Sequence, residues 1–285
     1  MSEKIKIIDC PRDAMQGMHG FIKTEDKIDH LTYLLKVGFD TIDCGSFVSP
    51  KIIPQMADSG EVLKAVKEVN SDSKLSVIVA SEGGAERALQ HENVDFLGFP
   101  FSISQQFQKD NTHKSREEAF QSILNISKMI ENTGKELLIY FSMAFGNPYG
   151  EEWSVELVKE WAARFAEIGI GNINLSDTTS VAAPKDVEEL FSNLIEKYPQ
   201  IEFGAHFHSE YNDWFPKVDA AYRNGCRRFD GAIKGFGGCP MAKSDLVGNT
   251  PTEKLISYSE SVGANHGLNL FAFESAYNSA LKVMG

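Results

Sequence analysis

The chain has 285 residues, a formal net charge of −12 at pH 7 and a sequence pI of about 5.1. This acidic balance disfavours a nucleic-acid partner, because a phosphate backbone would be repelled. Apolar residues make up 42% of the chain, enough to fill a core, but no apolar run approaches the roughly 18 residues that a membrane span needs.

Short β-rich runs alternate with amphipathic helical stretches from the N-terminus onward. In the first half, the apolar pattern predicts strands over residues 4–9, 39–43, 75–80 and 94–98. Helices are predicted from Thr24, expected to be a cap, to Gly38, over 59–69 and 84–91, and after Ser115, where Glu118 completes a capping box.

The second half repeats the same alternation. Strands are predicted over residues 136–142, 172–175, 201–206 and 228–233. Helices are predicted over 154–168, from Pro184, through Val218 to Gly225, after a capping box of Thr250 and Glu253, and over about 271–284.

About eight βα units with nearly continuous apolar strands indicate a parallel sheet covered by helices. We therefore expect a (β/α)₈ TIM barrel, a single domain over residues 1–285 with an extra C-terminal helix. A doubly wound open sheet is the alternative. It would favour a glycine-rich loop after the first strand, and residues 10–13 (C-P-R-D) are not such a loop.

Polar residues interrupt the apolar pattern at the carboxyl ends of the predicted strands. They are Arg12, Asp13, Asp43, Asp177, His206, His208 and Lys234. Because the catalytic groups of such barrels lie at these strand ends, we expect an active site there.

His206 and His208 give the sharpest indication of chemistry. On an extended segment, residues i and i+2 point to the same side, so both imidazoles would face the mouth of the barrel. Two adjacent imidazoles with a carboxylate nearby suit a divalent cation. Because Asp13 would add an oxygen ligand, we expect Mg²⁺ or Mn²⁺, although a Zn²⁺ ion could take the place in a crystal.

Other residues allow more than one interpretation. Arg12 can hold a carboxylate or a developing enolate by two parallel hydrogen bonds, or it can form a simple ion pair. Cys239 lies between glycines and a proline, where its thiol could act as an acid or base or stay inert. Lys234 would suit a Schiff-base aldolase if it were desolvated. We interpret Cys10 and Cys44 as packing residues.

Several segments together resemble the 3-hydroxy-3-methylglutaryl-CoA lyase family of TIM-barrel metallolyases. The segments are residues 10–16 (C-P-R-D-A-M-Q), 46–51 (S-F-V-S-P-K), 54–58 (P-Q-M-A-D), 147–149 (N-P-Y), 175–178 (L-S-D-T), 205–208 (A-H-F-H), 235–240 (G-F-G-G-C-P) and 248–253 (G-N-T-P-T-E). The resemblance runs from about residue 4 to the final helix. Several features depart from the family's pattern: Asp43 replaces a glutamate, His19 a lysine and Leu138 an arginine. In addition, residues 208–212 (H-S-E-Y-N) differ from the family's H-D-T-Y-G, and the segment between Cys239 and Asn249 is one residue longer.

The resemblance implies a set of site residues. Asp13, His206, His208 and Asn249 would bind the divalent cation. Arg12, Asp13, Asp43, His206 and Cys239 would be catalytic, and Gln16, Ser46, Asp177 and Thr178 would contact the substrate. The implied reaction is a retro-Claisen cleavage that yields acetyl-CoA and acetoacetate from an acyl-CoA thioester.

The resemblance also implies a homodimer and a role in leucine degradation, and the chain's N-terminus predicts a cytoplasmic location. The alternatives are a condensing synthase of the isopropylmalate or homocitrate type, a 4-hydroxy-2-oxo acid aldolase, or a barrel that binds a ligand without turning it over. The length of the chain and the cysteine loop favour the lyase.

Overall fold

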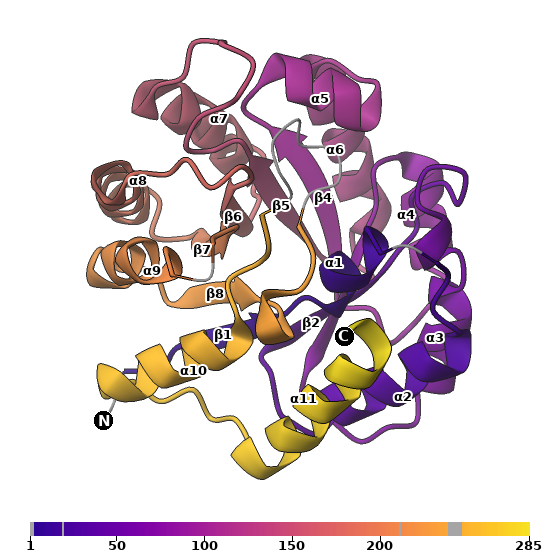
Figure 1. The fold of residues 1–285 in the computed structure, drawn as a ribbon. Coiled ribbons are helices and arrows are strands. Elements are labelled where there is room, and N and C mark those ends of the chain that lie inside the picture. Colours follow the sequence, from indigo (N-terminus) through magenta and orange to yellow (C-terminus); the bar gives the residue numbers. More distant parts are fainter. Residues whose placement is uncertain (1–2, 19, 211, 239–246) are drawn as a thin grey trace.

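Eight parallel strands, β1 to β8, form a closed barrel in sequence order in the computed structural model of the chain (Figure 1). It describes residues 3–18, 20–210, 212–238 and 247–285. The strands are β1 Lys6–Asp9, β2 Thr41–Ser46, β3 Lys74–Ile78, β4 Phe96–Ser102, β5 Glu136–Ser142, β6 Asn172–Asp177, β7 Glu202–Phe207 and β8 Arg228–Gly231. The predicted (β/α)₈ architecture is confirmed.

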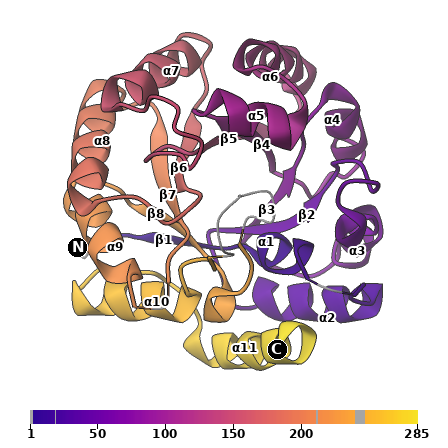
Figure 2. The same ribbon diagram turned by 45° about the horizontal axis from the view of Figure 1, so that its top comes forward.

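The described ranges contain eleven α-helices and two short 3₁₀ helices, η1 (Pro54–Met56) and η2 (Ile233–Gly235). The α-helices are α1 Pro11–Gln16, α2 Thr24–Leu35, α3 Ser59–Ala65, α4 Glu82–Ala88, α5 Gln105–Thr112, α6 Arg116–Ile130, α7 Val155–Glu167, α8 Pro184–Lys197, α9 Trp214–Arg223, α10 Thr252–Ser261 and α11 Leu270–Met284. Figure 2 shows most of them as a ring around the strands.

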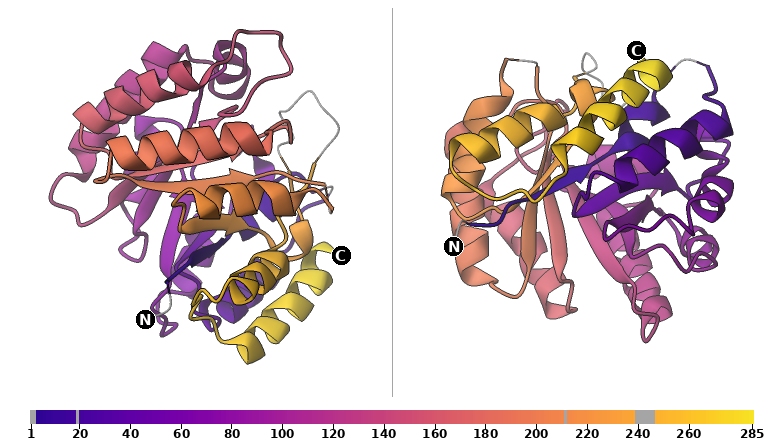
Figure 3. Two further views of the ribbon diagram at one scale, coloured as in Figure 1. Left: turned by 90° about the vertical axis from the view of Figure 1, so that its left-hand side faces the viewer. Right: turned by 90° about the horizontal axis from the view of Figure 1, so that it is seen from below.

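The last two helices extend the ring on one side of the barrel (Figure 3). Helix α10 contacts β1 and β8, and α11 packs against α2 on the outside. This α11 is the extra C-terminal helix that the sequence predicts. Within the described ranges, no helix combines the length and apolarity that crossing a membrane requires.

Some local expectations are wrong. The sequence pattern does not predict α1 and α5. Thr24 is the first residue of α2 rather than its cap, and its hydroxyl donates to Asp58. The capping box at α10 does not form, because Glu253 instead accepts a hydrogen bond from the backbone N–H of Lys234. The capping box of Ser115 and Glu118 is confirmed.

Strand register sets which side chains meet inside the barrel. In one layer, Asn174 of β6 pairs with Gly204 of β7, which pairs with Arg228 of β8. In the next layer toward the carboxyl ends, Ser176 pairs with His206, and His206 pairs with Asp230. Side chains two residues apart on a strand share a face, so these layers are stacked directly beneath the mouth of the barrel.

Candidate active site

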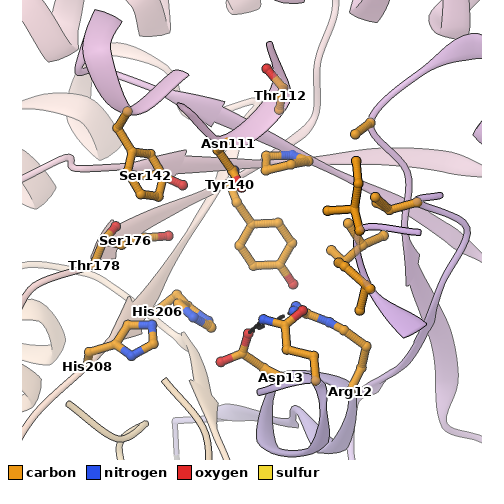
Figure 4. A pocket seen from close by; sticks show the side chains of 18 residues that line it. Arg12, Asp13, Asn111, Thr112, Tyr140, Ser142, Ser176, Thr178, His206 and His208 are labelled. Atoms are coloured by element: carbon orange, nitrogen blue, oxygen red, sulfur yellow. Dashed lines mark hydrogen bonds and ion pairs between the residues drawn. The ribbon is translucent and has the colours of Figure 1, made fainter. Parts of the chain in front are cut away.

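A cavity of about 170 Å³ opens at the carboxyl ends of the strands, where the sequence predicts the site (Figure 4). Its polar lining residues are Arg12, Asp13, Gln16, Asn111, Thr112, Tyr140, Ser142, Ser176, Thr178, His206 and His208. Its apolar lining residues are Val48, Ile52, Ile53, Ile78, Ala80, Pro100 and Phe107. The cavity thus offers both hydrogen-bonding groups and apolar contacts to a ligand.

Three predicted cation ligands meet in this cavity. A carboxylate oxygen of Asp13 and a ring nitrogen from each of His206 and His208 all lie within 4.8 Å of one another. All three residues are buried. His206 lies in β7, His208 follows that strand, and Asp13 lies in α1. The first and the seventh βα units of the barrel therefore meet here.

Each imidazole is oriented by a partner at Nδ1. His206 Nδ1 lies 3.0 Å from Asp230 Oδ2, and His208 Nδ1 lies 3.1 Å from the carbonyl oxygen of Val247. Both partners accept a hydrogen bond, so each Nδ1 carries the proton. The lone pair is then at Nε2, the form in which a neutral imidazole binds a metal.

Asp13 is held as a carboxylate. Its Oδ1 accepts hydrogen bonds from Arg12 Nη1 at 2.7 Å and Gln16 Nε2 at 2.8 Å. Burial alone would raise the pKa of Asp13, but the nearby Arg12, His208 and His206 lower it by more, so that the pKa falls to about 2. Asp13 is therefore ionised at neutral pH, as a metal ligand must be.

Arg12 is fixed by a second carboxylate, Asp43. Arg12 Nε and Nη2 donate to Asp43 Oδ2 at 3.0 and 2.5 Å. Burial lowers the pKa of Arg12, but Asp43 and Asp13 raise it above its ordinary range. The shorter aspartate, in place of the family's glutamate, thus still reaches the guanidinium, which has further N–H groups for a ligand.

Asn249 lies beside this cluster, where an isolated antiparallel bridge joins it to His208. Its Nδ2 donates to Asp13 Oδ2 at 2.8 Å and to the carbonyl oxygen of Phe236 at 2.9 Å. The amide nitrogen, not the oxygen, thus faces Asp13. To act as the predicted cation ligand, Asn249 must rotate its carboxamide.

The other predicted site residues have different positions. Gln16 and Thr178 line the cavity, whereas Ser46 and Asp177 do not. The carboxylate of Asp177 accepts hydrogen bonds from Lys217 Nζ at 2.6 Å and from the backbone N–H of Val181 at 2.9 Å. These contacts let Asp177 hold the β6–α8 connection in place, and a contact of Asp177 with the substrate stays a prediction.

Ser46 is also buried, and its hydroxyl accepts a hydrogen bond from the backbone N–H of Val48 at 3.2 Å.

Cys239 lies outside the described residues. Lys234 is exposed and does not line the cavity. The Schiff-base alternative, which requires a desolvated lysine, is therefore wrong for this residue.

Several cavity residues were not singled out from the sequence. Tyr140 and Ser142 lie two residues apart on β5, so the period of a strand could have placed both toward the mouth. Asn111 lies on α5, which the sequence pattern does not predict. Within the part of the chain that the structure describes, the buried Tyr140 hydroxyl and Ser176 Oγ have no hydrogen-bond partner. They are free to bind a polar ligand.

The donor set fits a hard or borderline divalent cation. One ionised carboxylate and two imidazoles with Nδ1 protonated supply the ligand types that Mg²⁺, Mn²⁺ and Zn²⁺ accept. The cavity that these ligands line leaves room for substrate oxygen atoms beside them. The arrangement matches an open catalytic site rather than a closed structural one.

Comparisons with known proteins agree with this geometry. Residues 4–279 match the family described as HMGL-like. The human mitochondrial hydroxymethylglutaryl-CoA lyase is 31% identical, with 95% of this chain and 82% of that protein covered. The (R)-citramalyl-CoA lyase of Chloroflexus aurantiacus is 28% identical, with 99% of this chain and 92% of that protein covered.

Solved structures show the same relationship. An HMG-CoA lyase from Acinetobacter baumannii, in complex with coenzyme A and 3-methylmalate, superposes with a TM-score of 0.90 and is 29% identical. The comparison covers 99% of this chain and 92% of that chain. The predicted family and the enzyme class, a carbon–carbon lyase, are confirmed: the chain belongs to the HMGL-like family.

Proposed function

We propose that this protein is a divalent-cation-dependent lyase that cleaves 3-hydroxy-3-methylglutaryl-CoA, or a close 3-hydroxyacyl-CoA, to acetyl-CoA and acetoacetate. The observation that carries the proposal is the meeting of Asp13, His206 and His208 within 4.8 Å at a cavity that Arg12 also lines. The names of the relatives support the acyl-CoA substrate.

Asp13, His206 and His208 would hold the cation, with Asn249 as the expected fourth protein ligand. A bound divalent cation lowers the pKa of the substrate's tertiary alcohol and fixes its geometry. The hydroxyl proton would pass to Asp13 or to His206. Asp13 has a second carboxylate oxygen to accept it, whereas His206 could accept it only while its Nε2 is not bound to the cation. As the alkoxide becomes a ketone, the adjacent carbon–carbon bond breaks and the electron pair moves into the thioester.

Arg12 stabilises the charge that this step creates. The leaving group is the enolate of acetyl-CoA, whose negative charge lies on the thioester oxygen. Asp43 and Asp13 hold the guanidinium in place before the substrate arrives, so no reorganisation is needed as the charge develops.

A proton must then reach the enolate carbon to complete acetyl-CoA. The sequence predicts Cys239 as the donor, on a loop at this side of the barrel. We expect Cys239→Ala to lower kcat by at least on the order of a hundredfold with the fold intact. Cys44→Ala is the control, because Cys44 is a buried packing residue, and it should keep its turnover. Equal turnover in both variants would remove Cys239 from the mechanism.

Citramalyl-CoA is the second candidate substrate. The Chloroflexus relative named for it covers nearly the whole chain, and the hydroxyl groups that line the cavity would also offer hydrogen bonds to a shorter dicarboxylic acyl group. Cleavage of this thioester also releases acetyl-CoA, but with pyruvate in place of acetoacetate.

A panel of acyl-CoA thioesters distinguishes these functions. The protein is treated with EDTA, reloaded with Mg²⁺ or Mn²⁺, and the CoA esters and keto acids are followed by mass spectrometry. We expect acetyl-CoA and acetoacetate from 3-hydroxy-3-methylglutaryl-CoA only with metal. Pyruvate from citramalyl-CoA would favour the second candidate. Condensation of acetyl-CoA with a 2-oxo acid would indicate a synthase, and no turnover of any thioester would indicate a binding scaffold.

Three further predictions concern the cell and the assembly. We propose a homodimer, which sedimentation equilibrium of the purified protein tests directly. We also propose a cytoplasmic location and a role in leucine degradation, both of which follow from the resemblance and the sequence pattern.

A further inference from the structure

We propose that Asp230 and Asn174 are positioning residues, which fix the ring of His206 and thereby set the cation affinity of the site. The inference rests on the cation site of the proposed function. Neither residue lines the cavity, and the sequence pattern singles out neither of them.

The contacts form a short chain of hydrogen bonds inside the barrel. Asp230 Oδ2 lies 3.0 Å from His206 Nδ1 and also accepts a hydrogen bond from Asn174 Nδ2 at 2.8 Å. All three side chains are buried. Because one carboxylate oxygen accepts from both partners, Asn174 restricts the position from which Asp230 can hold the imidazole.

Gly204 leaves the space that the hydrogen bonds from Asn174 through Asp230 to His206 need. Gly204 of β7 lies between Asn174 of β6 and Arg228 of β8 in the layer farther from the mouth of the barrel, and Asp230 lies in the next layer toward the mouth. To reach Asp230 on β8, the side chain of Asn174 must pass across β7, and it does so at Gly204. A Cβ at Gly204 would lie 2.2 Å from Asn174 Oδ1 and 3.1 Å from Arg228 Cδ. Any larger residue at position 204 must displace Asn174 from Asp230.

The consequence for the cation follows from the tautomer of His206. With Nδ1–H donated to Asp230, the lone pair at Nε2 points toward Asp13 and His208. Without Asp230, the ring can turn or carry its proton at Nε2, and neither arrangement binds a metal on that side. Loss of the hydrogen bond that a metal-binding histidine donates from its other ring nitrogen typically weakens metal binding by about 10- to 100-fold.

Cys10 offers a competing interpretation, because its thiol, His206 and Asp230 also lie within 4.8 Å of one another. A second cation there would need a thiolate. His206 Nδ1 and Asp230 Oδ2 lie 3.0 Å apart, the length of a direct hydrogen bond, so the ring nitrogen and the carboxylate that a cation here would need already bind each other. The contact between His206 and Asp230 is therefore a hydrogen bond that orients the ring, not a shared metal site.

Mn²⁺ affinity of the EDTA-treated protein, measured by electron paramagnetic resonance without substrate, tests the proposal. We expect Asp230→Asn and Asn174→Ala to weaken binding by about 10- to 100-fold and by about 3- to 10-fold, respectively. Asn172→Ala is the matched control. Asn172 lies two residues before Asn174 on the same strand and also donates to a carboxylate, Glu136 Oε2 at 2.9 Å, but does not contact Asp230. It should leave the Mn²⁺ affinity unchanged.

The ring nitrogens of His206 give a readout that a loss of packing alone would not move. In ¹⁵N-histidine spectra of the metal-free protein, with His206 assigned by its loss in His206→Gln, we expect protonation at Nδ1. Asp230→Asn should shift the ring toward a mixture of tautomers. If Asn174 acts through Asp230, the double variant should bind Mn²⁺ no more weakly than Asp230→Asn alone.

Gly204→Ala provides an independent variant if Asp230→Asn fails to fold, and it should weaken Mn²⁺ binding as Asn174→Ala does. Unchanged affinity and an unchanged tautomer in folded Asn174→Ala and Asp230→Asn would overturn the proposal. Both readouts are made without substrate. They can therefore fail while the thioester panel succeeds, or succeed while the proposed substrate proves wrong.

Discussion

Arg12 occupies the most constrained position among the site residues. It is buried, it donates to two carboxylates, and it lies beside the cation ligands. Lysine has a compact charge and cannot reproduce the planar fork that Asp43 holds. The function of Arg12 therefore depends on the geometry of its donors and not only on its positive charge.

Arg12→Lys should lower kcat by at least on the order of a hundredfold, because one transition-state hydrogen bond of this type contributes about 3 kcal/mol. Steady-state kinetics with the preferred thioester measures the change. The matched control is Arg164→Lys, since Arg164 forms a surface ion pair with Glu117 and should keep its turnover. Turnover of Arg12→Lys within threefold of the unsubstituted protein would contradict the role of Arg12.

Among individual residues, the sequence predicts the cation ligands but not the residues that orient them. The i, i+2 spacing of His206 and His208 requires only that they lie on a strand. The contact of His206 with Asp230 depends on the register of β7 against β8, which no local pattern encodes. The orientation of Asn249 and the ion pair of Asp177 with Lys217 likewise depend on contacts between distant segments.

Among the elements, two short helices supply much of the cavity. Helix α1 positions Arg12 and Asp13 one turn after β1 and begins at Pro11, whose missing N–H is harmless at a helix start. Helix α5 begins after Ser104, which caps the backbone N–H of Phe107. Both helices have too few residues for an apolar period to develop, so periodicity alone cannot predict them, although both starts carry a recognisable residue.

The contact of α2 with α11 gives a pH-dependent stability. Burial lowers the pKa of His30 in α2 from 6.5 to about 4, and its Nδ1 lies 3.2 Å from Ser279 Oγ in α11. The folded protein thus keeps His30 neutral, whereas the unfolded chain binds a proton below about pH 6.5. The stabilisation is complete above pH 6.5 and is lost as the pH falls toward 4.

We expect the protonation of His30 in the unfolded chain to lower the free energy of unfolding by about 3 kcal/mol between pH 7 and pH 4. Urea unfolding across this range should show a smaller loss for His30→Gln. His113→Asn is the control, because His113 is exposed and asparagine tolerates its left-handed backbone, with φ of 57°. Equal pH slopes for His30→Gln and the unsubstituted protein would show that His30 is not the titrating group.

For the whole molecule, barrel closure brings distant residues to one site. Asp13 and Asn249 are joined by a hydrogen bond although 236 residues separate them. The alternation of strands and helices predicts the barrel and the end that carries the chemistry. It does not predict the register around the barrel, and hence not which predicted residues, such as Ser46 and Asp177, fall outside the cavity.

Because the ligands come from segments far apart in the sequence, after β1 and at the end of β7, cation binding should stabilise the folded protein as a whole. At a Mn²⁺ concentration about a hundredfold above Kd, linkage adds about 2.7 kcal/mol, which corresponds to a rise in Tm of about 4–5 °C. Differential scanning calorimetry with EDTA and with Mn²⁺ measures this shift. Asp13→Asn removes the carboxylate and should abolish it. A shift of equal size in that variant would locate the bound ion elsewhere.

The coordination of one bound Mn²⁺ ion tests the central claim most directly. Electron spin-echo modulation of the EDTA-treated protein, reloaded with a single equivalent of Mn²⁺, should show ¹⁴N couplings from two imidazoles. One coupling should be lost in His208→Ala and both in the double variant with His206→Ala. A tightly bound ion without imidazole couplings, or couplings unchanged by these substitutions, would contradict a cation site formed by Asp13, His206 and His208.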